Sequence, residues 1–169
     1  MKPIQVEREI FRYEQGAFKH IEDSIVTEFP VTIKMNGQEF VTMVSTPEYI
    51  EDMVIGFLAS EGIIRKYEDI DDIWVQEKEG FVHVTTTKVN PYYEQMQNKR
   101  YITSCCGMRR QGFVFANDAL SAKKMNGVHV QVAAEDCFRL MKEMQQSAET
   151  FHHTGGVHNA SLCNVNGII

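Results

Sequence analysis

The stretch VTIKMNGQEFVTMVSTPEYIEDMVIGFLASEGII (31–64) sets the fold of the first half of this chain. Its opening part predicts a β-hairpin. A strand at about residues 28–35 is followed by Asn36-Gly37, a dipeptide typical of two-residue hairpin turns. A return strand then runs from Gln38 to Ser45 and completes the pair.

The second part of the same stretch predicts a helix. Thr46 is a favourable N-cap residue and Pro47 suits the first helical position, while Gly62 ends the helix. Apolar residues recur between them at helical spacing, and this stripe predicts a buried core face without a catalytic role: Ile50, Met53, Val54, Phe57 and Leu58.

Two further strands follow, and then the organisation of the chain changes. Strands are predicted at Ile70–Glu77 and Phe81–Thr87, and His83 falls within the alternation of the second, which favours a structural role. Residues 88–104 are interpreted as a linker because Asn90-Pro91 breaks regular structure. We therefore expect a β-rich domain over residues 1–90 and a second domain over residues 91–169. Residues 1–26 show no clear period.

The second half predicts one main helix between short strands. A short strand is expected at Gly112–Ala116, and a helix begins near Ala134 and ends at Gly155-Gly156. Cys137 lies on the apolar face of this helix, which predicts a buried thiol. That face also holds Ala134, Met141, Met144, Ala148 and Phe151. A strand is expected over Val157–Val165.

The end of the sequence carries a second hairpin signal. Asn166-Gly167 is followed only by Ile168 and Ile169, and a return strand normally needs several residues. We therefore expect the 169-residue chain to be incomplete at the carboxyl end of its second domain.

Composition restricts the class of protein. The longest apolar run, MVIGFLA (53–59), is too short to span a bilayer, and MKPIQVEREI (1–10) lacks the apolar core of a signal peptide. Four cysteines without a secretory context favour free thiols in a reducing compartment, so a cytoplasmic location is expected. A net charge of −6 argues against general nucleic-acid binding.

Charge is distributed unevenly along the chain. Residues 48–79 hold ten acidic residues against three basic ones, whereas residues 99–124 hold six basic residues against Asp118 alone. A charged run of this kind is commonly a solvated face. The alternative is a local positive field that holds a thiolate and attracts an anionic ligand.

The basic segment contains the strongest chemical signal, TSCCGMRRQG (103–112). A thiol reacts as its thiolate, and nearby cations such as Arg109 and Arg110 increase the ionised fraction. Gly107 keeps the backbone adaptable beside Cys105 and Cys106. This loop is where we expect chemistry.

Four stretches together resemble the FdhD/NarQ family of formate dehydrogenase accessory sulfur carriers. They are VTIKMNGQEFVTM (31–43), TPEYIEDMVIGFLASEGII (46–64), TSCCGMRRQ (103–111) and FHHTGGVHNASLC (151–163). All occur in the family's order. The resemblance implies an α+β protein in which a small β-rich domain precedes a cytidine-deaminase-like three-layer α/β domain. It also implies a homodimer.

The resemblance implies a function as well. Family members take persulfide sulfur from a cysteine desulfurase and pass it to the molybdenum cofactor, bis-molybdopterin guanine dinucleotide, for formate dehydrogenase. By this likeness Cys106 carries the sulfur and Cys105 is a helper or an alternate. Thr154, Gly155, Gly156, His158 and Arg109 are the expected cofactor-binding residues, and GDP or another guanine nucleotide could bind in the cofactor's place. A plain helix C-cap is the alternative role of the two glycines.

The cysteine loop departs from the usual family pattern. Family members usually have Cys-x-x-Cys, but here Arg109 stands where the second cysteine would be. A mechanism that needs a resolving thiol two residues on is therefore in doubt.

The residues bear on three other functions. Zinc-dependent deamination is rejected, because no proline precedes a cysteine, as the Pro-Cys-x-x-Cys zinc motif requires. A zinc site is disfavoured, because adjacent cysteines and adjacent histidines reach one ion poorly. A non-catalytic adaptor that docks desulfurase, cofactor and dehydrogenase stays open, with the acidic residues 48–79 as its contact face.

Overall fold

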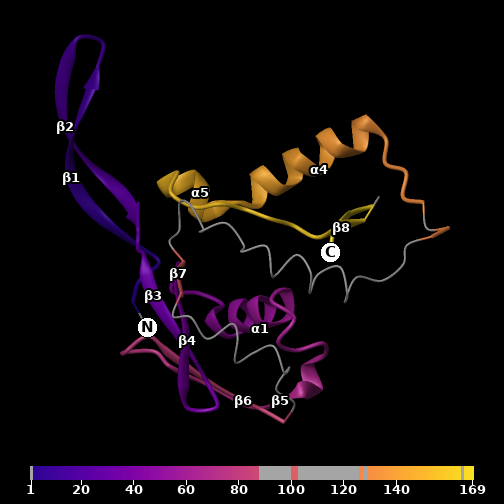
Figure 1. The fold of residues 1–169 in the computed structure, drawn as a ribbon. Helices are drawn as coiled ribbons and strands as arrows, with labels where there is room; N and C mark the ends of the chain where they lie inside the picture. Colours follow the sequence, from indigo (N-terminus) through magenta and orange to yellow (C-terminus); the bar gives the residue numbers. More distant parts are fainter. Residues whose placement is uncertain (1, 88–99, 103–125, 128, 165) are drawn as a thin grey trace. The chain divides into compact units, whose positions relative to one another are not determined.

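The structure is a computed structural model that describes residues 2–87, 100–102, 126–127, 129–164 and 166–169 (Figure 1). The chain forms two compact units. Unit 1 comprises Met1–Pro3 and Glu28–Lys123, and unit 2 comprises Ile4–Thr27 and Lys124–Ile169. The predicted domain boundary near residue 90 lies outside the described residues and stays a prediction.

Unit 1 is built on a five-stranded mixed sheet with the strand order β5-β6-β3-β4-β7. β3 pairs with β4 antiparallel and with β6 parallel, β5 adds to β6 antiparallel, and β7 adds to β4 parallel. The strands are β3 (Phe29–Met35), β4 (Gln38–Ser45), β5 (Ile70–Gln76), β6 (Phe81–Thr86) and β7 (Arg100–Ile102). The four strands predicted from the sequence between residues 28 and 87 are thereby confirmed. The prediction of a linker over 88–104 is wrong at residues 100–102, because these residues pair with β4 and form the strand β7.

The predicted Asn36-Gly37 turn is also confirmed. Both residues have positive φ angles, 48° and 85°, as a type I′ turn requires. Asn36 does more than turn the chain. Its side-chain Oδ1 accepts a hydrogen bond from the Thr86 backbone N–H at 3.0 Å, and its own N–H donates to Val84 O at 2.9 Å. The turn is therefore tied to β6 as well as to its own hairpin.

Helix α1 (Ile50–Ser60) packs on one face of this sheet (Figure 1). Alternate residues of β3 and β6 face the helix, and Ile50, Val54 and Leu58 are its buried residues. The predicted core stripe is confirmed. The buried apolar cluster comprises Phe29, Val31, Ile33, Met35, Phe40, Val41, Met43, Ile50, Val54, Leu58, Ile63, Ile64, Val82 and Val84.

The ends of α1 test the predicted capping residues. Gly62 has a left-handed φ of 70° just beyond the helix, so the predicted end is confirmed. The predicted start is wrong, because Tyr49 and not Thr46 is the N-cap residue and Pro47 precedes the helix. Tyr49 adopts a left-handed conformation (φ 50°, ψ 37°), which separates the Thr-Pro segment from the helical turns. A short 3₁₀ helix, η1 (Tyr67–Asp69), follows α1.

The other face of the sheet carries a row of ring contacts. The rings of Trp74 and His83 stack in parallel with centroids 4.0 Å apart, and His83 Nε2 lies 3.4 Å from Gln76 Oε1. Lys34 Nζ lies 3.8 Å above the Phe81 ring. These contacts favour the structural role predicted for His83.

Unit 2 opens with a long hairpin that the sequence reading missed. β1 (Gln5–Glu14) and β2 (Ala17–Val26) pair antiparallel in unbroken register and form a twisted ribbon (Figure 1). Gln15 and Gly16 make the turn with φ angles of 52° and 82°. Gln15-Gly16 is a weaker turn signal than Asn-Gly, and both faces of the ribbon mix apolar with charged residues, so no period-2 pattern stood out.

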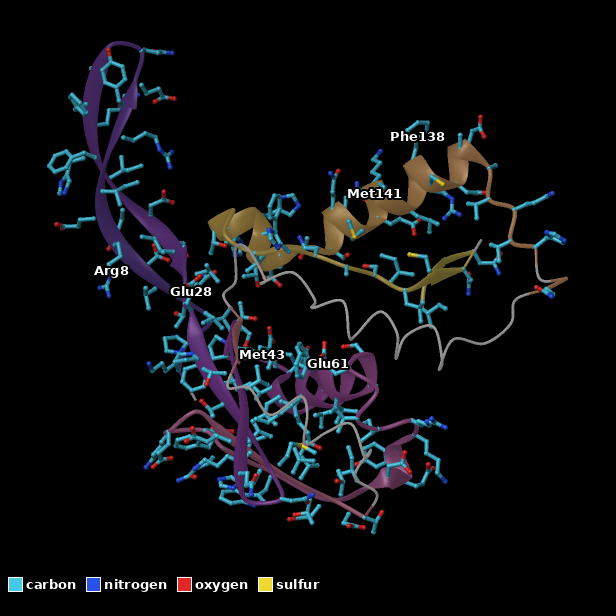
Figure 2. All side chains as sticks on the ribbon, viewed as in Figure 1. Arg8, Glu28, Met43, Glu61, Phe138 and Met141 are labelled. Atoms are coloured by element: carbon cyan, nitrogen blue, oxygen red, sulfur yellow. The ribbon has the colours of Figure 1, made fainter. Side chains whose placement is uncertain are left out.

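The second-half helix begins at Ala134 as predicted but is divided in two. α4 (Ala134–Ser147) and α5 (Glu149–Thr154) meet at Ala148, whose ψ of 67° interrupts the helix. The predicted buried face is wrong. Cys137 is exposed, Phe138 and Met141 keep 75% and 51% of their surface, and neither helix has a buried residue (Figure 2). Helical spacing creates an apolar face, but burial needs a second layer against it.

The end of unit 2 is a minimal hairpin. β8 (Cys163–Asn164) pairs antiparallel with β9 (Gly167–Ile168). The strand predicted over 157–165 is therefore wrong for residues 157–162, which are irregular. The Asn166-Gly167 signal does mark a hairpin, although Gly167 belongs to the return strand rather than to the turn.

These elements confirm the predicted α+β class with a β-rich N-terminal part. The deaminase-like form of the second domain stays a prediction. Among the described residues, no helix combines the length and the apolar character needed to cross a membrane.

Candidate functional site

The predicted reactive residues Cys105, Cys106 and Arg109 lie outside the described residues, as does the strand predicted at 112–116. The structure does describe how the chain approaches them. β7 ends at Ile102, one residue before the TSCCGMRRQG segment, and pairs with β4 in parallel. β4 is part of the well-packed sheet of unit 1, so the segment follows a strand on a rigid scaffold.

The predicted cofactor-binding segment, Thr154 to His158, begins at the end of α5. Gly155 is the C-cap residue, with a left-handed φ of 64°, and its N–H donates to Phe151 O at 2.8 Å. Thr154 Oγ1 donates to Thr150 O at 2.7 Å and accepts the Gly156 N–H at 3.2 Å. The backbone N–H groups of both glycines are thus engaged inside the turn.

Gly156 has a second structural reason to be glycine. A Cβ atom built on it would lie 2.7 Å from Val26 Cγ1, at the end of β2. Real Cβ atoms do not approach another carbon this closely, so the α5 turn packs against β2 only because residue 156 lacks a side chain. Within unit 2, the backbone of the α5 turn therefore lies directly against the Val26 side chain of β2.

This geometry favours the helix C-cap over a preformed anion site. A phosphate held by the Gly155 and Gly156 N–H groups would have to replace hydrogen bonds that the turn already makes. His158 is exposed and follows the turn by two residues. The nucleotide-binding role of Thr154, Gly155, Gly156 and His158 stays a prediction, and binding there requires the turn to exchange partners.

Two polar side chains of α4 and α5 make contacts that hold the helices. His152 Nε2 lies 2.6 Å from Gln145 O, which joins the last turn of α5 to α4 across the break at Ala148. On α4, hydrogen bonds to Glu143 and Asp136 raise the pKa of Arg139 above its ordinary value. These pairs, at 2.8 and 3.1 Å, tie the guanidinium to the helix surface.

The cysteines and histidines of the described residues do not form a metal centre. Within these ranges, no three histidine, cysteine, aspartate or glutamate side chains gather closely enough to hold an ion. Cys163 is half-buried, with Sγ 3.8 Å from Ser161 O, and Cys137 is exposed on α4.

Comparison with known proteins decides the family. A model of the FdhD/NarQ family matches residues 26–169, which include the Thr-Pro segment with α1, the cysteine segment and the Thr154–His158 turn. The chain belongs to the FdhD/NarQ family.

Among curated FdhD/NarQ proteins, the chain is similar to several named sulfur carrier protein FdhD. It is 49% identical over 169 residues to that of Shouchella clausii and 46% identical over 162 residues to that of Bacillus subtilis. These alignments cover 99% and 96% of this chain but 63% and 61% of the relatives. The chain thus spans about three fifths of the length of the curated relatives it matches.

A solved structure supports the fold of the FdhD/NarQ chain. The crystal structure named as that of a formate dehydrogenase accessory protein from Desulfotalea psychrophila superposes with a TM-score of 0.63 at 17% sequence identity. It covers 98% of this chain, and the match covers 60% of that protein. At this level of identity the likeness concerns the fold alone.

Proposed function

We propose that this chain acts as a sulfur carrier in the maturation of formate dehydrogenase. It takes sulfane sulfur from a cysteine desulfurase as a persulfide on Cys106, with Cys105 as helper or alternate. It passes the sulfur to the molybdenum cofactor, bis-molybdopterin guanine dinucleotide, which is its acceptor substrate. On this proposal the chain is a sulfurtransferase and works as a homodimer.

The observation that supports this proposal is the 49% identity over 169 residues to a protein named sulfur carrier protein FdhD. The aligned region contains both adjacent cysteines and both arginines of the 103–112 segment. Unit 1 contributes a scaffold, because a strand of its buried sheet leads directly into this segment.

The loading step follows from thiol chemistry. The Cys106 thiolate attacks the outer sulfur of the desulfurase persulfide, forming one S–S bond and breaking another. The desulfurase cysteine leaves as a thiolate, so no oxidant or reductant is consumed. Arg109 and Arg110 would favour the thiolate of Cys106 by placing positive charge beside it.

Intact-mass analysis tests the carrier function. After incubation with a cysteine desulfurase and cysteine, the wild-type chain should gain the mass of about one sulfur atom, and reduction should remove it. Cys106→Ala should abolish the gain, and Cys105→Ala is the matched control. Loss in Cys105→Ala alone would assign the sulfur to Cys105. No gain in folded wild-type protein would support the adaptor alternative.

Alkylation kinetics test the role of the arginines. If the two guanidinium groups lower the pKa of the Cys106 thiol, replacing both with glutamine should slow iodoacetamide modification at pH 7. One pKa unit corresponds to about 1.4 kcal/mol between the thiol and thiolate forms. Equal rates in the wild type and the double variant would remove the arginines from the mechanism.

Calorimetric titration with GDP tests the nucleotide-binding segment. Thr154→Ala removes the hydroxyl that now holds the Gly156 N–H, and His158→Ala removes the exposed imidazole. Both variants should weaken GDP binding if the Thr154 hydroxyl and the His158 imidazole contact the phosphates once the turn has opened. His129→Ala, a change at another exposed histidine of unit 2, is the control. Unchanged affinity in both variants would leave the segment with its C-cap role alone.

A further inference from the structure

The β1–β2 hairpin carries a cluster of rings on one face near its turn. Phe11 and Tyr13 alternate along β1 and lie opposite His20 and Phe18 on β2. The Phe11 and His20 ring centroids are 4.9 Å apart, and those of Tyr13 and Phe18 are 5.1 Å apart. The four side chains thus form one continuous surface, here called the ring patch.

Pairing within the ribbon leaves most of this surface in water. Phe11, Tyr13 and Phe18 keep 73%, 65% and 74% of their surface exposed. Cross-strand ring pairs do help to hold two strands together, by about 0.5–1.5 kcal/mol each. Only the contacting edges of the rings make that contribution. It therefore does not explain why three large apolar side chains stand at positions that stay mainly exposed to water. A contiguous exposed apolar patch marks an interaction surface.

The same face becomes acidic toward the base of the hairpin. Glu7 and Glu9 continue the ring-patch side of β1, and Glu22 continues it on β2. Glu9 and Glu22 lie directly opposite each other, an arrangement in which like charges repel. His20 Nε2 lies 3.5 Å from Glu9 Oε2, at the edge of this pair. A cation supplied by a partner would relieve the repulsion between Glu9 and Glu22.

The opposite face of the ribbon is different. Arg12 pairs with Asp23 at 3.1 Å and Lys19 pairs with Glu14 at 2.7 Å, so much of its charge is balanced within the ribbon. Arg8 also projects from this face of β1 (Figure 2). Because the basic side chains there are largely paired, the opposite face of a second copy is a poor complement for the acidic one.

We propose that the ring patch and the adjoining Glu9–Glu22 pair form a docking surface for a partner protein. The partner's surface presents lysine or arginine side chains beside an apolar pocket. The rings supply the apolar anchor, and the glutamates supply electrostatic complementarity and register. The family match begins at residue 26, so almost all of this hairpin lies outside it and the docking surface goes beyond the proposed function.

Binding of the full chain to an immobilised cysteine desulfurase tests this inference. The choice of the desulfurase as the partner protein rests on the proposed function. Phe11→Ser/Phe18→Ser and Glu9→Lys/Glu22→Lys should each weaken binding about tenfold or more. The lysine pair keeps a like-charge pair at the same register, so ribbon pairing changes little while the sign of the charge reverses. Arg12→Ser/Lys19→Ser on the opposite face should stay within about twofold.

Amide hydrogen exchange across β1 and β2 shows whether each variant keeps the hairpin. If the serine variant loses the hairpin, the binding of the lysine variant alone decides whether the inference holds. Wild-type binding should also weaken between about 50 mM and about 300 mM salt. The inference is overturned if the wild type does not bind, if both face variants bind like the wild type, or if the opposite-face control loses as much. It is also overturned if sedimentation shows that the face variants abolish self-association instead, which would make the occupant a second copy.

Sulfur loading from a small-molecule persulfide separates this result from the proposed function. That reaction needs Cys106 but no docked protein. If the wild-type chain is loaded by the small-molecule persulfide but does not bind the desulfurase, the docking surface is overturned and the carrier function is supported. If the chain binds the desulfurase through the hairpin but is never loaded with sulfur, the docking surface is supported and the carrier function is overturned.

Discussion

Units 1 and 2 carry similar apolar patterns, yet among the residues that the structure describes only those of unit 1 are buried. In unit 1, one helix and a five-stranded sheet enclose a continuous cluster that runs from Phe29 to Val84. In the described part of unit 2 no residue is buried, although α4 has a clear apolar face (Figure 2). The difference teaches that period predicts an element, whereas burial depends on what packs against it.

The sharpest test of this comparison is one matched pair of truncations. Leu58→Ala removes a fully buried side chain of α1 and should lower the free energy of unfolding by about 2–5 kcal/mol. Met141→Ala on α4 should cost less than about 1 kcal/mol, because Met141 is half exposed. Trp74, the single tryptophan, lies in unit 1, so its fluorescence in a urea titration measures the effect of Leu58→Ala, and hydrogen exchange of the α4 amides measures that of Met141→Ala in unit 2. Equal losses from the two variants would contradict the comparison.

A smaller effect is expected at the turn that joins β3 and β4. Asn36→Ala forces alanine into a left-handed conformation and removes the acceptor of the Thr86 N–H, at a combined cost of about 2–3 kcal/mol. Asn36→Gly keeps the conformation and removes only the acceptor, so about 1 kcal/mol should be lost. The same fluorescence titration measures both. If the glycine variant is as unstable as the alanine variant, the backbone conformation is not the cause.

The smallest effect is expected at the α5 turn of unit 2. Gly155→Ala places a Cβ at a left-handed φ and should cost about 1 kcal/mol locally, whereas Gly155→Asn, which tolerates that conformation, should cost less. Hydrogen exchange of the Phe151–Gly156 amides reports the change. Trp74 fluorescence should show the same unfolding midpoint for all three proteins, and a shifted midpoint would show that the two units unfold together.

Residue types with strong local preferences made several elements predictable. The two positive φ angles at Asn36-Gly37, the left-handed Gly62 and the left-handed Gly155 are conformations that these residues adopt readily. The start of α1 was not predictable in the same way. Thr46-Pro47 has good capping chemistry, but Tyr49 takes a left-handed conformation that no local preference of tyrosine indicates.

In the candidate site, too, some features were predictable from the sequence and others needed the structure. The roles of Cys105, Cys106 and Arg109 came from sequence likeness, and they stay with the proposed function. At the α5 turn the sequence left two roles open for Gly155-Gly156. The hydrogen bonds of both N–H groups, and the 2.7 Å approach of Val26 to a Cβ at residue 156, favour the structural one.

The sequence alone determined the family, the α+β class, the β3–β4 hairpin and the core face of α1. Each depends on a motif or on contacts between residues near one another in the chain. Only the tertiary structure decided that β7 joins the sheet beside β4, that Gly156 meets Val26, and that Cys137 is exposed. These features depend on pairing and packing between distant segments, which a local pattern permits but does not specify.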